Sequence, residues 1–151
     1  MELLVLIGLP GAGKSTFYRQ RFFDTHLRVN LDQLRTRARE TALIQTCLRG
    51  KIRFVWDGTN STRAARAPVL RSAREAGFRV HAFWFEPDFR ACLERNARRS
   101  GGARVPVAAI GSIAKQLQQP EFDEGFSSVF SVRNFGANGF RVEEWTRQLP
   151  P

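Results

Sequence analysis

At 151 residues, with 42% hydrophobic and 25% charged side chains, the chain has the size and composition of one globular domain, which we expect to span residues 1–151. No apolar run approaches the roughly 18 residues that a membrane span needs, which excludes a membrane-spanning protein. The formal net charge is +10, and arginines supply most of the positive charge. This balance favours a polyanionic partner because guanidinium groups match phosphate oxygens, although an arginine-rich solvated surface is the alternative.

The first predicted element is a buried strand that leads into a glycine-rich loop. Residues 3–7 are uninterruptedly apolar, and the loop that follows reads G-L-P-G-A-G-K-S-T. Backbone N–H groups in such a loop bind phosphate oxygens, Lys14 can bridge the outer phosphates, and the Ser15 hydroxyl can ligate Mg²⁺. A glycine-rich turn can also form without a ligand, but strand, spacing, lysine and serine together predict a site for ATP or another nucleoside triphosphate. The predicted nucleotide-binding residues are Gly8, Gly11, Ala12, Gly13, Lys14, Ser15 and Thr16.

Downstream of the loop, apolar periodicity and turn residues predict alternating helices and strands. The predicted helices are 14–21, 31–48, 62–76, 88–98 and 105–117, and the predicted strands are 27–30, 52–56, 78–85 and 127–132, with a short edge strand ending near 145. This alternation predicts an α/β fold: a parallel sheet of about five strands with helices on both faces. Ligands of such sheets gather at the carboxyl ends of the strands.

Polar residues follow two of the predicted strands at that edge. Asp32 and Arg35 are three residues apart at the start of a predicted helix, so we expect them to share a face. The carboxylate of Asp32 can accept a hydroxyl proton, while Arg35 can bind a phosphate of the acceptor; a helix-capping Asp with an incidental Arg is the alternative. Asp57 can hold Mg²⁺ together with Ser15. Thr59 and Asn60 are predicted to shape the acceptor site.

The segment from Arg95 to Pro106 reads R-N-A-R-R-S-G-G-A-R-V-P and predicts a helical lid. Arg95 and Arg99 are four residues apart on one helix face, and the glycines that follow offer a hinge. We therefore expect the lid to close over the triphosphate, with Arg99 at the transferring group. The alternative is a solvated basic helix end, which the helix dipole favours by itself.

The combination of motifs resembles the P-loop kinases of the polynucleotide 5'-hydroxyl kinase family, and is similar to the kinase domain of phage polynucleotide kinase. The resemblance rests on the phosphate loop, N-L-D-Q-L-R at 30–35, D-G-T-N at 57–60, the lid segment, and E-G-F at 124–126. It implies that Asp32 is the general base for a 5'-hydroxyl, Arg35 a ligand of the acceptor's phosphate, Asp57 the second acidic residue and Arg99 the lid arginine.

The expected function is therefore an ATP- and Mg²⁺-dependent cytoplasmic kinase that phosphorylates the 5'-hydroxyl end of DNA or RNA, as in nucleic acid repair. Four arginines of one predicted helix favour a nucleic-acid acceptor: Arg63, Arg66, Arg71 and Arg74. A P-loop kinase for a small alcohol, such as a nucleoside, sugar or metabolite, is the nearest alternative. A nucleotide-dependent switch without transfer activity is a third, but it would leave Asp32 without a role.

Overall fold

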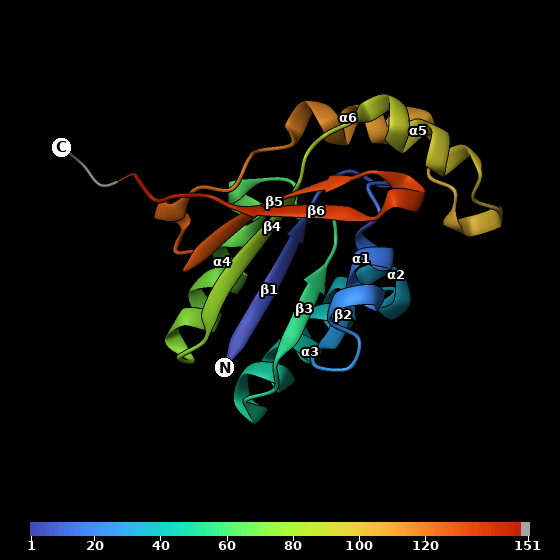
Figure 1. Cartoon of the computed structure of the whole chain (residues 1–151). Helices are drawn as coiled ribbons and strands as arrows, with labels where there is room; N and C mark the ends of the chain where they lie inside the picture. Colours follow the sequence, from blue (N-terminus) through green and yellow to red (C-terminus); the bar gives the residue numbers. More distant parts are fainter. Residues whose placement is uncertain (149–151) are drawn as a thin grey trace.

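A single six-stranded sheet organises the computed structural model, which describes residues 1–148 (Figure 1). In chain order the strands are β1 (Glu2–Ile7), β2 (Leu27–Asn30), β3 (Phe54–Asp57), β4 (Arg79–Phe85), β5 (Ser128–Asn134) and β6 (Phe140–Glu144). Their order across the sheet is β2-β3-β1-β4-β5-β6. The first five strands run parallel, and β6 pairs antiparallel with β5 at the edge.

Helices cover both faces of this sheet. They are α1 (Lys14–Arg21), α2 (Leu31–Leu34), α3 (Arg37–Gly50), α4 (Arg63–Glu75), α5 (Phe89–Ala97) and α6 (Val107–Gln116), with 3₁₀ turns η1 (Gly101–Ala103), η2 (Phe122–Glu124) and η3 (Gly136–Asn138). Alternate residues of β1 face opposite sides, as strand geometry requires: Leu3 and Val5 pack with α3 and α4, whereas Leu4 and Leu6 pack with α1 and α5. The predicted α/β sheet covered on both faces is confirmed, with six strands where about five were expected.

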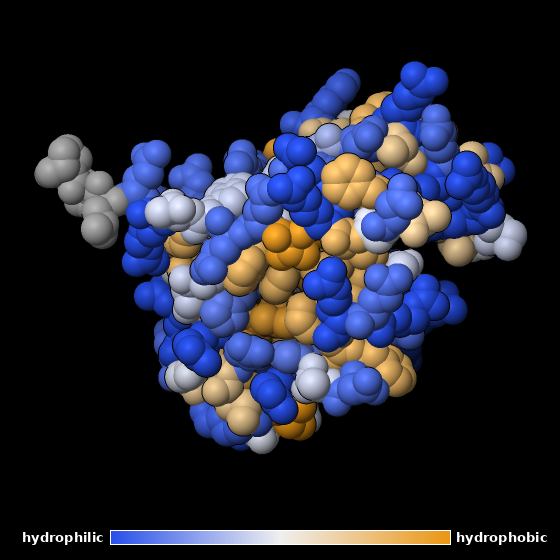
Figure 2. Space-filling view, viewed as in Figure 1, coloured by the Kyte–Doolittle hydropathy of each residue, from blue (hydrophilic) through white to orange (hydrophobic). Residues whose placement is uncertain are grey.

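The face that carries α1 is only partly covered by helices. Figure 2 shows apolar surface in the middle of this face, framed by hydrophilic side chains. Partly buried hydrophobic residues that pack against the core on this side include Phe22, Phe130, Phe140 and Val142. Both cysteines are free and buried, as predicted. None of the helices in residues 1–148 has the length and apolar character to cross a bilayer.

The single helix predicted for residues 31–48 is wrong, because the chain breaks it at Arg35. Helix α2 is one turn long, and Arg35 ends it with a φ of 76°, in the left-handed region. Thr36 then caps the N-terminus of α3 by accepting a hydrogen bond from Arg39 N over 3.2 Å. A threonine that can cap a new helix is the local signal for this break. Asp32 and Arg35 thus lie at the start and the end of one turn, not along a continuous helix.

The sheet register brings the predicted functional segments to one edge. Asp57, the last residue of β3, is paired with Leu6 of β1 and with Asn30 of β2. The phosphate loop follows β1 directly, and α2 follows β2 directly. The carboxyl ends of three adjacent strands therefore place the loop, Asp57 and α2 side by side.

Candidate active site

The glycines of the phosphate loop are required by both conformation and space. Gly11 and Gly13 have φ values of 82° and 95°, which side-chain-bearing residues rarely adopt. A Cβ atom on Gly11 would lie 2.6 Å from the Cys92 carbonyl oxygen of α5, and one on Gly13 would lie 2.5 Å from Asn134 Nδ2 of β5. The loop therefore packs closely between α5 and the end of β5, with two residues in the left-handed backbone region.

Lys14 folds back over this loop. Its Nζ donates to the carbonyl oxygens of Gly8 over 2.8 Å and Leu9 over 2.7 Å. Burial lowers the pKa of Lys14 from 10.5 to about 8, against an opposing attraction to Asp57. A phosphate group bound in the loop would favour the charged ammonium. Lys14 thus lies where the sequence predicts, and its predicted contact with the outer phosphates remains to be tested.

The two residues predicted to bind Mg²⁺, Ser15 and Asp57, converge on a residue that sequence reasoning missed. Arg28 of β2 donates from Nε to Asp57 Oδ2 and from Nη2 to Ser15 Oγ, each over 2.7 Å. Asp57 is only 2% exposed. A hydroxyl and a carboxylate oxygen that meet at one cation position are the kinds of donor that Mg²⁺ takes, so these residues fit the ion. In the sequence, the only sign of this role was that Arg28 is a charged residue within the strand predicted at 27–30.

Asp32 lies on a turn that is tied directly to Asp57. Asn30 caps α2 by accepting from Gln33 N over 3.1 Å, and its Nδ2 donates to the Asp57 carbonyl oxygen over 2.9 Å. The Asp32 side chain is exposed on this turn, and its charge raises the pKa of Lys14. The turn that carries Asp32 thus lies at the same edge of the sheet as the phosphate loop. Asn30, which was not predicted as a site residue, positions it.

Thr59 and Asn60 hold the loop after β3 against the phosphate loop. The Thr59 carbonyl oxygen accepts from Gly8 N over 3.2 Å. Asn60 is buried with a φ of 45°, and its Nδ2 donates to the carbonyl oxygens of Leu6 and Trp56 over 2.9 and 3.3 Å. These contacts are structural, and contact of either residue with an acceptor stays a prediction.

The lid segment is folded against the phosphate loop at one end. Arg95 Nη1 donates to the Gly11 carbonyl oxygen over 3.0 Å, and the charge of Arg99 lowers the pKa of Lys14. The predicted glycine hinge forms the 3₁₀ turn η1. Asn96 joins the two ends of the lid segment by exchanging two hydrogen bonds with the backbone of Val105. Arg95 is therefore in direct contact with the phosphate loop, and contact of Arg99 with a nucleotide stays a prediction.

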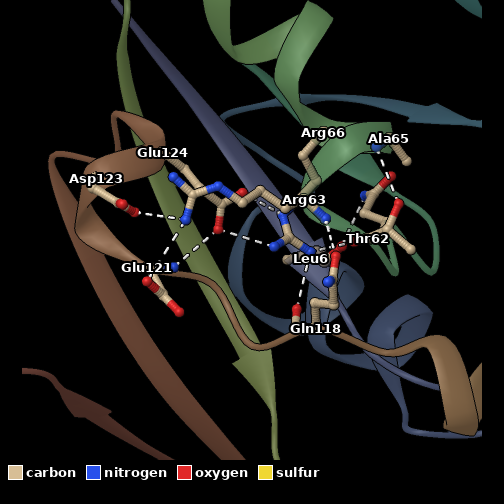
Figure 3. A network of polar contacts seen from close by, with 10 residues as sticks. Leu6, Thr62, Arg63, Ala65, Arg66, Gln118, Glu121, Asp123 and Glu124 are labelled. Atoms are coloured by element: carbon tan, nitrogen blue, oxygen red, sulfur yellow. Dashed lines mark hydrogen bonds and ion pairs between the residues drawn. The ribbon is translucent and has the colours of Figure 1, made fainter.

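The basic face predicted for α4 is wrong in part. Arg66 is completely buried, and its Nε and Nη2 donate to the two carboxylate oxygens of Glu124 over 2.8 and 2.9 Å (Figure 3). Its Nη1 also donates to the Asn60 carbonyl oxygen over 2.8 Å. Arg63 is paired with Asp123 at 2.8 Å. The E-G-F segment thus completes a structural ion pair with Arg66, whereas Arg63, Arg71 and Arg74 remain exposed.

Comparison with known proteins agrees with this architecture. A family model described as AAA domain matches residues 31–120. The chain is 27% identical over 135 residues to a bifunctional polynucleotide phosphatase/kinase of Schizosaccharomyces pombe. It is 28% identical over 138 residues to a putative bifunctional polynucleotide phosphatase/kinase of Acanthamoeba polyphaga mimivirus. Each match covers 87% of this chain and 33% of the relative, so the chain spans about a third of the length of these curated relatives.

Solved structures show the same fold at lower identity. Kti12 of Chaetomium thermophilum, solved in complex with ADP-AlF3, superposes with a TM-score of 0.68 at 17% identity, over 87% of this chain and 88% of that one. A gluconokinase from Sinorhizobium meliloti superposes with a TM-score of 0.60 at 16% identity, over 87% and 82%. With the phosphate loop at the carboxyl edge of a parallel sheet, the chain belongs to the AAA domain family and has the fold of the P-loop kinases.

Proposed function

We propose that this protein is a polynucleotide 5'-hydroxyl kinase, which transfers the γ-phosphate of ATP to the 5'-hydroxyl end of DNA or RNA. The observation that carries the proposal is the attachment of α2 to Asp57 through Asn30, which keeps the turn that carries Asp32 at the same edge of the sheet as the phosphate loop. Two relatives named polynucleotide phosphatase/kinase support the choice of acceptor.

In this proposal the chain's own residues bind the nucleotide and orient the acceptor. Backbone N–H groups of residues 8–16 bind the phosphates, and Lys14 moves from its loop carbonyls to the outer phosphate oxygens. Ser15 and Asp57 would hold Mg²⁺, which neutralises phosphate charge when it is bound. Arg95 and Arg99 of the lid contact the triphosphate, with Arg99 at the transferring group.

In the transfer step, Asp32 is the group that accepts the proton. The 5'-oxygen forms a bond with the γ-phosphorus while the bond from that phosphorus to the β–γ bridging oxygen breaks, and ADP leaves. The Asp32 carboxylate accepts the proton of the 5'-hydroxyl. Arg35 binds the phosphate on the 3' side of the reacting nucleotide, with Thr59 and Asn60 nearby.

A kinase for a small alcohol is the second candidate. The burial of Arg66 favours it, because it removes one of the four arginines of α4 from the surface, and Asp123 offsets the charge of the exposed Arg63. The fold shared with a gluconokinase is compatible with this reading.

The test supplies labelled ATP and Mg²⁺ with a panel of 5'-hydroxyl oligonucleotides, nucleosides and small alcohols. We expect transfer to oligonucleotides, weakened by salt because the acceptor binds through phosphates. Asp32→Asn should lower kcat by about 100-fold or more while acceptor binding survives. Arg35→Ala should instead raise KM for an oligonucleotide and change little for a nucleoside.

Arg49→Ala is the matched control, since Arg49 lies in the last turn of α3, away from this edge. Turnover on a small alcohol alone, unaffected by salt, would replace the polynucleotide acceptor with the second candidate. Full activity of Asp32→Asn would reject Asp32 as the base.

A further inference from the structure

Arg28 is the cation that allows Asp57 to be buried. An ionised carboxylate removed from water is strongly disfavoured unless a cation and hydrogen bonds compensate it. Asp57 is 2% exposed, and the structure of residues 1–148 gives its carboxylate an ion pair with Arg28 alone. Lys14, the other cation close by, donates its hydrogen bonds to carbonyl oxygens of the phosphate loop. Without Arg28, the Asp57 carboxylate would have no directly bound cation.

The same guanidinium occupies the position that a metal ion would take. Arg28 nitrogen atoms lie 2.7 Å from Ser15 Oγ and 2.7 Å from Asp57 Oδ2, the two predicted ligand oxygens. Mg²⁺ coordinates its oxygen ligands at about 2.0–2.1 Å and demands a nearly octahedral shell. A guanidinium hydrogen-bonded to both oxygens leaves no room for that shell, and its positive charge repels the ion. Metal and guanidinium therefore exclude each other in this arrangement.

We propose that Arg28 is the resident cation of the metal position in the nucleotide-free protein, and that Mg²⁺ binds by exchange with it. The inference rests on the Mg²⁺-dependent nucleotide site of the proposed function. The exchange keeps Asp57 neutralised before metal arrives. It also makes metal loading release one positive charge beside the phosphate loop.

The Arg28 guanidinium makes a further contact besides those with the two oxygens. The Arg28 side chain is 21% exposed, so it is not locked into the core. Its Cζ lies 5.8 Å from the ring centroid of Tyr18 in α1, within range of a cation–π contact. Tyr18 is itself fixed by donating to the His26 carbonyl oxygen over 2.7 Å. We expect the exchange to require rotation of this one partly exposed side chain.

Metal titration tests the exchange directly. In Arg28→Met the competing cation is gone, so half-saturation with Mn²⁺, read by electron paramagnetic resonance, should occur at a lower metal concentration than in the wild type. If the conformer with Arg28 displaced is populated to about one part in ten, the shift is roughly tenfold. The Mg²⁺ concentration needed for calorimetric binding of ADP should shift in the same direction.

Thermal unfolding supplies a second readout without nucleotide. In metal-free buffer, Arg28→Met should melt below the wild type because Asp57 has lost its cation. Added Mg²⁺ should then raise the Tm of the variant more than that of the wild type. Arg141→Met is the matched control, since Arg141 forms an exposed ion pair with Glu143 at 3.0 Å in the edge strand β6. It should leave both readouts unchanged.

Arg28→Lys covers the case in which Arg28→Met does not fold. A lysine keeps the charge but replaces the paired guanidinium donors by one ammonium, so its half-saturating metal concentration should lie below that of the wild type. Equal or higher half-saturating concentrations in both variants, or equal effects of Mg²⁺ on the Tm of variant and wild type, would overturn the exchange. The kinase proposal is judged separately, by transfer to acceptors that these binding experiments omit.

Discussion

At the scale of single residues, His81 of β4 carries an electrostatic cost of burial. Its Nδ1 is buried and has no hydrogen-bond partner within residues 1–148. Burial is the main cause that lowers the pKa of His81 below 6.5, and the charge of Arg79 lowers it further. The charges of Glu2 and Glu144 oppose this shift, and Glu2 Oε2 lies 3.6 Å from His81 Nε2. The unfolded chain therefore takes up a proton at His81 at a higher pH than the folded chain does. The free energy of unfolding falls as the pH falls from 6.5 through the lowered folded-state pKa.

This sign gives a prediction for His81→Gln. Urea denaturation between about pH 5 and 8 should show a shallower loss of unfolding free energy on acidification than in the wild type. Each pKa unit of lowering that is removed corresponds to about 1.4 kcal/mol. Parallel curves for variant and wild type would assign the acid sensitivity to other groups.

At the scale of elements, the lid is defined by the closure of its base as well as by its arginines. Asn96 is 2% exposed in α5; its Nδ2 donates to the Val105 carbonyl oxygen over 2.6 Å and its Oδ1 accepts from Val105 N over 2.8 Å. This pair joins the end of α5 to the segment just before α6. The loop between them carries Arg99, so Asn96 fixes where that side chain starts. We therefore predict that Asn96 positions the lid.

We expect Arg99→Ala to slow the chemical step, because Arg99 is predicted to contact the transferring group, and Asn96→Leu to have a milder effect of the same kind. Misplacement of the lid should lower kcat on the order of 10- to 100-fold, with a smaller change in KM for ATP. Asn96→Asp, which keeps the accepting oxygen, should lie between Asn96→Leu and the wild type. The double variant with Arg99→Ala should be no slower than Arg99→Ala alone. A lower Tm with an unchanged kcat would reduce Asn96 to a structural residue.

At the scale of the whole molecule, the ion pair of Arg66 and Glu124 joins segments far apart in the sequence. Arg66 of α4 also donates to the carbonyl oxygens of Asn60, after β3, and Gln118, after α6 (Figure 3). Arg66→Met should cost about 3–5 kcal/mol of unfolding free energy because it leaves the Glu124 carboxylate buried without a cation. Adding Glu124→Leu should recover part of this loss, as measured by urea denaturation.

The exposed pair beside it is the matched control. Arg63→Ala removes an ion pair with Asp123 in which both side chains are largely solvated, so the unfolding free energy should change little. A double variant of Arg66 and Glu124 that is less stable than Arg66→Met alone would contradict the unpaired-charge explanation.

The sequence by itself determined the parts of the molecule whose chemistry is local. The phosphate loop follows from nine consecutive residues, and its glycine spacing, Lys14 and Ser15 lie where the motif predicts. The alternation of strands and helices predicted a sheet covered on both faces. From that sheet alone it follows that Asp57 and the start of α2 share the edge of the phosphate loop, because parallel strands align their carboxyl ends.

Only the tertiary structure decided which charges are paired. Arg28 and Asp57 are 29 residues apart, and Arg66 and Glu124 are 58 residues apart. An arginine in a strand or on a helix looks the same in sequence whether it is solvated or buried against a carboxylate. The energy of such a pair depends on burial and geometry, which strand register and helix packing set. The prediction that Arg66 belongs to the exposed surface of α4 was wrong for this reason. Arg28 could be assigned to the site only from the pairing of β2 with β3.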